Sequence, residues 1–135
     1  QRLGAERTPW AYRWRSLRDA GARLALGSDV PVESPDPRLG LWAAVTRRPP
    51  EGTAHEGWNL PEALSLAEAI AGYTTWAAWA GFEEDWRGAI APGYAADLTV
   101  LDRALDPADP ASILQARVVR TVVAGRDAFV AGSQT

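Results

Sequence analysis

The sequence lacks cysteine, methionine and lysine, and it contains a single histidine, His55. Without cysteine the chain can form no disulfide, iron–sulfur cluster or zinc ribbon, and it can offer no cysteine nucleophile. A metal centre needs three or more His, Cys or carboxylate ligands in one place, and this chain supplies at most one imidazole and no thiolate. Because no methionine stands at its start, we expect Gln1 to be a processed or truncated beginning.

The charge balance is mild and acidic. All fourteen basic residues are arginine, and seventeen acidic residues outnumber them, which gives a net charge of -3. A nucleic-acid partner would require a basic stripe, so we expect none. No apolar run approaches the roughly 18–20 residues of a membrane span, so we expect no membrane partner either. We expect a cytoplasmic location, and the formation of an oligomer stays open.

The apolar content is sufficient for a folded core. Of the 135 residues 47% are hydrophobic, and seven are tryptophan. Four tryptophans recur at helical spacing and are expected to pack in the core: Trp10, Trp14, Trp76 and Trp79. Trp42 and Trp58 lie outside that spacing and are free to line the entrance of a pocket.

The first part of the chain predicts helices around one buried strand. The helices are expected at residues 9–20, 39–47 and 65–80, the last with a capping box of Ser65 and Glu68 and a bend at Thr74 and Thr75 between two shorter helices. The short apolar run 22–28 lies between glycines and ends in a polar cluster, which predicts a buried strand. A helix, a glycine and a buried strand in this order favour a parallel sheet.

The last part of the chain predicts β structure, beginning near residues 82–88. Pro92 and Gly93 are typical of a type II turn. Strands are expected at residues 98–101, 117–123 and 127–130, with Gly125 in the turn of a hairpin.

Asp29 is the strongest candidate for a functional residue. It directly follows the predicted buried strand, where parallel α/β folds place ligands and catalytic groups. The small neighbours Gly27 and Ser28 leave room for a ligand to approach. The alternative is that the Asp29 side chain only opens the proline-rich turn that follows, and position alone leaves both roles open.

Four blocks of the sequence resemble the amidohydrolase superfamily. Residues 17–32 (LRDAGARLALGSDVPV) are similar to its eighth barrel strand, and residues 64–74 (LSLAEAIAGYT) to its next helix. Residues 88–101 (GAIAPGYAADLTVL) and 119–130 resemble the strands and closing hairpin of its small β domain. The likeness is greatest to amidohydrolase family 3, which includes N-substituted formamide deformylase-like enzymes.

This resemblance implies a fold and an activity. The fold class is α/β: residues 1–87 would be the C-terminal βα elements of a (β/α)8 barrel, and residues 88–135 part of a small β-sandwich-like domain. A complete barrel needs about 250 residues, so we expect a C-terminal fragment of a larger enzyme, inactive without its upstream part. The implied reaction is metal-dependent hydrolysis of a C–N bond in a small amide, formamide or cyclic amide, with zinc as the expected ion. Asp29 would bind the metal and act as the catalytic acid–base group.

Two further residues and two rival functions remain open. Arg47 follows a predicted helix; it either holds a carbonyl or carboxylate of the substrate or simply faces the negative end of that helix. His55 is expected to be an exposed loop residue. The rival hypotheses are a non-catalytic scaffold or interaction module, and a small sugar-binding domain that uses Trp42 and Trp58.

Overall fold

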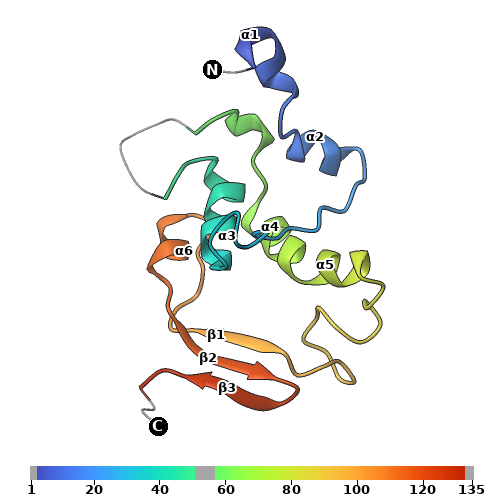
Figure 1. Ribbon diagram of the computed structural model, residues 1–135, viewed down its shortest axis with the longest axis vertical. Helices are drawn as coiled ribbons and strands as arrows, with labels where there is room; N and C mark the ends of the chain where they lie inside the picture. Colours follow the sequence, from blue (N-terminus) through green and yellow to red (C-terminus); the bar gives the residue numbers. More distant parts are fainter. Residues whose placement is uncertain (1–2, 51–56, 133–135) are drawn as a thin grey trace.

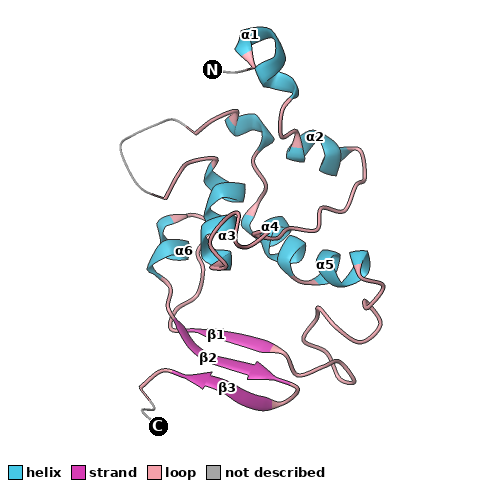
Figure 2. Cartoon of the chain, viewed as in Figure 1, coloured by secondary structure: helices cyan, strands magenta, loops and turns pink. Residues whose placement is uncertain are grey.

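The computed structural model describes residues 3–50 and 57–132, so His55 lies outside the described residues. Long loops join short helices, and a small antiparallel sheet lies at the C-terminal end (Figures 1 and 2). The elements in chain order, with η for a 3₁₀ helix, are α1 (Gly4–Arg7), η1 (Thr8–Trp10), α2 (Trp14–Asp19), α3 (Pro37–Thr46), η2 (Leu60–Glu62), α4 (Leu66–Tyr73), α5 (Thr75–Ala80), β1 (Leu98–Leu101), α6 (Ala111–Gln115), β2 (Val118–Val123) and β3 (Arg126–Val130).

The helix predicted over residues 9–20 is interrupted. Tyr12 adopts a φ of 51°, in the left-handed region that a right-handed helix cannot contain. The chain therefore forms η1, breaks, and starts again as α2 at Trp14. The prediction of one continuous helix is wrong, although Gly21 follows α2 with the positive φ expected of a glycine after a helix.

The other predicted helices are confirmed, and local capping explains their starts. The Asp36 side chain accepts a hydrogen bond of 3.0 Å from the N–H of Arg38 at the start of α3. Ser65 and Glu68 form the predicted capping box of α4, and Thr74 interrupts the helix before α5. No described helix has the length and hydropathy of a membrane-spanning segment.

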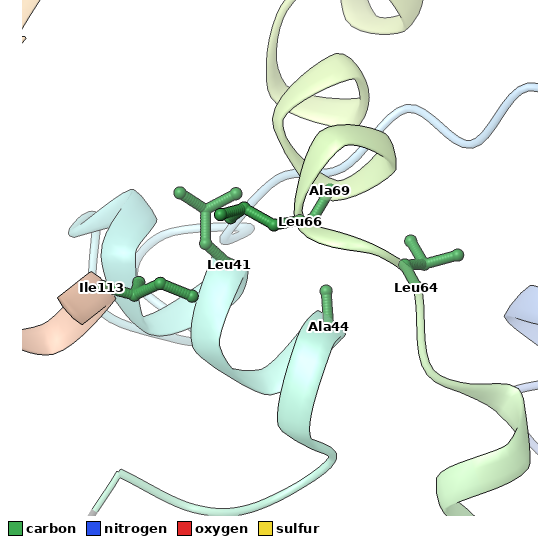
Figure 3. Close-up of a cluster of buried hydrophobic side chains, with 6 residues drawn as sticks. All are labelled: Leu41, Ala44, Leu64, Leu66, Ala69 and Ile113. Atoms are coloured by element: carbon green, nitrogen blue, oxygen red, sulfur yellow. The ribbon is translucent and has the colours of Figure 1, made fainter. Parts of the chain in front are cut away.

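A small apolar core joins α3, the start of α4 and α6 (Figure 3). Its buried side chains are Leu41, Ala44, Leu64, Leu66, Ala69 and Ile113. Ile113 comes from α6 and is the largest fully buried side chain. Arg38 adds a polar contact between α3 and the end of α6, since its Nη1 donates to the main-chain oxygen of Ala116 at 2.5 Å. The division between residues 87 and 88 stays a prediction, and this core draws side chains from both sides of it.

The three predicted strands are confirmed and form one antiparallel sheet in the order β1-β2-β3. Ala124 and Gly125 join β2 to β3, and both have positive φ, as a two-residue hairpin turn requires. Every residue of β3 is exposed. The described chain is thus mixed α/β, with a sheet that is small and largely open to solvent.

The predicted buried strand at residues 22–28 is extended, but it pairs with no other strand within the described ranges. Its residues alternate between exposed and partly buried, with Leu24 and Leu26 packed against the core. The N–H of Leu26 donates to the main-chain oxygen of Gly72 at 3.0 Å. A β-strand needs the hydrogen bonds of a neighbouring strand, whereas helix α4 lies beside residues 22–28. The parallel sheet predicted from this segment does not occur among the described residues, whose one sheet is antiparallel.

The tryptophans are less buried than their spacing predicts. Trp10 is 72% exposed and Trp79 is 44% exposed, so their assignment to the core is wrong. Trp14 and Trp76 are partly buried, and Trp14 packs against the core. The break at Tyr12 separates Trp10 from the face that Trp14 presents, which is why helical spacing is misleading here.

Candidate functional site

Asp29 lies in an exposed turn at the end of the extended segment 22–28. It has a φ of 52°, a left-handed conformation that Asp tolerates better than most residues. Its main-chain oxygen accepts a hydrogen bond of 2.8 Å from the N–H of Val32, and the peptide bond between Val30 and Pro31 is cis.

The turn is closed by the backbone of Asp29 and not by its side chain. No hydrogen bond or ion pair of the Asp29 carboxylate occurs among the described residues. The interpretation in which the side chain opens the proline-rich turn is therefore wrong. The carboxylate is free to act on a ligand.

Gly72 explains how the segment that leads to Asp29 is positioned. A Cβ at residue 72 would lie 2.7 Å from Cγ of Leu26 and 2.9 Å from the main-chain oxygen of Leu24. Only glycine lets α4 approach the extended segment this closely. The buried face of α4 therefore determines the path of residues 22–28 up to Asp29.

The residues present do not fit a metal ion on their own. Within residues 3–50 and 57–132, no group of three or more His, Cys, Asp or Glu side chains lies close enough together to hold a metal. Asp29 could supply one ligand. A site that binds zinc or another divalent ion needs further ligands, which the described residues do not provide.

Arg47 occupies the C-terminal end of α3, where it has a left-handed φ of 58° and its N–H donates to the main-chain oxygen of Ala43. Its guanidinium carbon lies 4.4 Å from the ring centroid of Trp14 and 5.0 Å from that of Trp58. Nε donates to the main-chain oxygen of Trp58 at 3.1 Å, and the Trp58 N–H donates back to the Arg47 oxygen at 2.9 Å. Two aromatic rings and the hydrogen bond of Nε thus hold this side chain in place, while the second hydrogen bond joins the main chains of Arg47 and Trp58.

The Arg47 guanidinium is buried, with only 8% of the residue exposed. Burial lowers the pKa of Arg47 from its ordinary value, although the negative charge of Glu62 acts against this. The Glu62 carboxylate is itself engaged by the N–H and O–H of Ser16 and by Arg13, whose Nε lies 3.7 Å away. Nη2 of Arg47 is buried and has no hydrogen-bond partner among the described residues.

An open pocket of about 250 Å³ lies beside Arg47. We call it the aromatic pocket; its lining residues are Tyr12, Trp14, Ala43, Arg47, Arg48 and Trp58. Gly57 makes it possible, because a Cβ at that position would lie 2.6 Å from the main-chain oxygen of Thr46. The loop that carries Trp58 can therefore approach the end of α3.

Sequence reasoning found part of this arrangement. Trp58 lines the aromatic pocket as predicted, but Trp42 does not; its indole N–H donates to the main-chain oxygen of Pro49 at 3.2 Å. The aromatic pocket thus contains one of the two tryptophans of the sugar-binding hypothesis. Tyr12 was missed because no sequence pattern marks it, and Trp14 because its helical spacing predicted core packing only.

Asp29 and Arg47 are not brought together by any contact among the described residues. Asp29 precedes α3 by a loop, whereas Arg47 follows its last residue. The end of α3 thus positions Arg47, whereas Asp29 lies at the end of segment 22–28.

Comparison with known proteins gives relatives that are much longer than this chain. It is 38% identical over 125 residues to the YtcJ amidohydrolase of Bacillus subtilis (strain 168), which covers 93% of this chain and 24% of that protein. It is 38% identical over 113 residues to N-substituted formamide deformylase of Arthrobacter pascens, covering 82% of this chain and 20% of that protein. It is 36% identical over 102 residues to the protein LONG AFTER FAR-RED 3 of Arabidopsis thaliana, covering 75% of this chain and 17% of that protein.

The chain therefore spans about a quarter or less of the length of these curated relatives. No solved structure matches it. The sequence pattern of the Amidohydrolase family matches residues 1–129, nearly the whole chain. The chain belongs to the amidohydrolase family.

Proposed function

We propose that this chain is part of a hydrolase that cleaves C–N bonds, and that Asp29 is its catalytic carboxylate. Membership of the amidohydrolase family supports the reaction class. The likeness to an N-substituted formamide deformylase supports formamides as substrates, and the proposal extends to other amides and cyclic amides.

The observation that carries the proposal is the free carboxylate of Asp29. It is exposed, it has no partner among the described residues, and the backbone presents it in a turn that does not need the side chain. A carboxylate in this state can accept a proton from an attacking water molecule and return it to the leaving nitrogen. That role requires contact with the substrate, which an exposed turn permits.

The proposal includes a divalent metal, with zinc as the expected ion, and a (β/α)8 barrel completed by residues outside this chain. Asp29 is the one residue of the chain that would bind that metal, and the other ligands would come from residues outside the described ranges. The coverage of the relatives, 24% and 20% of their lengths, agrees with this view. In this proposal the 135 residues have no activity by themselves.

The test compares two Asp→Asn variants of the intact protein, supplied with zinc, against a panel of N-substituted formamides, linear amides and cyclic amides. Asp29→Asn keeps the side-chain size and tolerates the left-handed φ, so it removes the charge alone. Turnover should fall by about 100-fold or more, because general acid–base groups contribute that much. Asp85→Asn is the matched control, since Asp85 is also exposed and has no ion pair in the described structure.

Unchanged turnover in Asp29→Asn would remove this residue from the mechanism. If the unmodified protein hydrolysed no member of the panel, the hydrolase proposal would be wrong and the interaction-module hypothesis would be favoured. The melting temperature of each variant shows that the comparison is made between folded proteins.

A further inference from the structure

The wall of the aromatic pocket is mostly apolar, and the only charged side chains among its described lining residues are basic. Two of its six lining residues are arginines, Arg47 and Arg48, and none is acidic. Arg48 is exposed and Arg47 is buried. Neither guanidinium forms an ion pair with another described residue. Glu62 acts on Arg47 through its charge, but it forms no ion pair with Arg47; its carboxylate accepts hydrogen bonds from Ser16 and lies 3.7 Å from Nε of Arg13. The pocket is therefore suited to an anion.

The buried Nη2 of Arg47 is a hydrogen-bond donor without an acceptor. A charged donor that is buried and unsatisfied costs free energy, and an acceptor that reaches it recovers that cost. Nε is already used by the main-chain oxygen of Trp58, so the guanidinium is held in place while Nη2 is left over. This combination favours a ligand that carries a planar, negatively charged acceptor, for which guanidinium groups are well matched.

The rest of the lining specifies what the anion is attached to. Tyr12, Trp14 and Trp58 are arranged edge to face, with ring centroids 6.1 Å apart for Tyr12 and Trp14 and 5.7 Å apart for Tyr12 and Trp58. Aromatic walls of this kind pack well against another aromatic ring. The open volume of about 250 Å³ has room for a molecule of one ring and a short substituent.

We propose that the aromatic pocket binds a small aryl carboxylate, with the ring among Tyr12, Trp14 and Trp58 and the carboxylate on Arg47 and Arg48. Nη2 is buried in the absence of a ligand, so the proposal includes a shift of a neighbouring side chain when the ligand binds. The proposal concerns binding alone. It does not depend on the proposed hydrolysis, because binding is measured without turnover.

The experiment titrates the intact protein with benzoate and phenylacetate, and with benzamide as the neutral isostere, by calorimetry and ligand-observed NMR. We expect benzoate to bind with a Kd of about 1 mM or tighter, and benzamide to bind at least about tenfold more weakly, since a charge-assisted hydrogen bond contributes that much. Arg47→Gln should weaken benzoate binding by about tenfold or more. Arg48→Gln, at an exposed position that the fold does not need, should weaken it about two- to fivefold.

Arg23→Gln is the matched control, because Arg23 also stacks on a tryptophan, 4.8 Å from the ring centroid of Trp79, but lies outside the aromatic pocket. It should leave benzoate binding unchanged. Equal affinity for benzoate and benzamide would overturn the proposal, as would full benzoate binding by a folded Arg47→Gln protein. The proposal would also be overturned if Arg48→Gln did not change the benzoate affinity. It would be overturned as well if Arg23→Gln reduced the benzoate affinity as strongly as Arg47→Gln does.

Discussion

Glu68 connects the N-terminal helix α2 to the capping box of α4, and removing its charge should destabilise the fold. Its carboxylate accepts hydrogen bonds from the N–H and O–H of Ser65, at 2.9 and 2.8 Å. It also accepts two from Arg15, one of them from Nη1 at 2.9 Å, and Nε of Arg18 lies 3.6 Å away. Glu68→Gln is a clean perturbation, because glutamine can still complete a capping box.

The expected loss follows from the pKa of Glu68. Hydrogen bonds from Arg15, more than any other cause, lower it from an ordinary 4.5 to about 2. A pKa lowered from 4.5 to about 2 corresponds to about 3–4 kcal/mol of stability as an upper value. The Arg15 side chain is 31% exposed, so solvent screening reduces this. We expect Glu68→Gln to lower the free energy of unfolding by about 1–2 kcal/mol at neutral pH.

The loss should depend on pH in a definite direction. A carboxyl group whose pKa is lowered by folding stabilises the protein above its unfolded pKa, and this stabilisation disappears as the pH falls through the folded pKa. The difference between the unmodified protein and Glu68→Gln should therefore be complete above a pH of about 5 and should vanish toward a pH of about 2. Urea denaturation at a series of pH values measures it.

Glu83→Gln is the control for this measurement. Glu83 also pairs with an arginine, Arg87, at 3.0 Å, but both side chains are well exposed. Such a surface pair contributes about 0.5 kcal/mol or less. Glu68 would not have the stabilising role proposed for it if Glu68→Gln lowered the free energy of unfolding no more than Glu83→Gln does. The same conclusion would follow if the loss caused by Glu68→Gln were equal at neutral and acidic pH.

Two further predictions concern packing. Ile113→Ala should lower the free energy of unfolding by about 2–4 kcal/mol, because this side chain is fully buried in the core with residues of α3 and α4. Denaturant titrations measure this loss. A loss below about 1 kcal/mol would show that α6 is not part of the core. Gly72→Ala should lower the free energy of unfolding by about 1–3 kcal/mol, because the new Cβ would lie 2.9 Å from the main-chain oxygen of Leu24. The better helix propensity of alanine is too small to offset this clash. In the same thermal melts Gly81→Ala should be nearly neutral, since its nearest contact is 3.5 Å; equal losses at both positions would contradict the packing argument.

The parts of the fold that were predicted correctly depend on local interactions. The capping box of Ser65 and Glu68 uses residues three positions apart, and the hairpin turn at Gly125 uses adjacent ones. Signals of this kind are complete within a short window of sequence. The same holds for the start of α3, where Asp36 caps a helix that begins with proline.

The parts that were predicted wrongly depend on contacts between distant residues. Tyr12 leaves the helical region where its ring meets both Trp14 and Trp58, and Trp58 lies 46 residues further along the chain. Helical periodicity over residues 9–20 cannot register such a contact. The unpaired state of residues 22–28 is likewise a tertiary property, because an apolar run does not say which backbone lies beside it.

The two candidate residues differ in what holds them. Arg47 is fixed within the described fold: it ends α3, whose Leu41 and Ala44 lie in the core, and it is clamped by Trp58. Asp29 is exposed, and its carboxylate has no partner among the described residues, so a catalytic role for it requires groups that they do not supply. The aromatic pocket should therefore bind its ligand wherever this fold is intact. Hydrolysis by Asp29 should appear only when the remaining groups of the active site are present, and this is why binding and turnover test the two proposals separately.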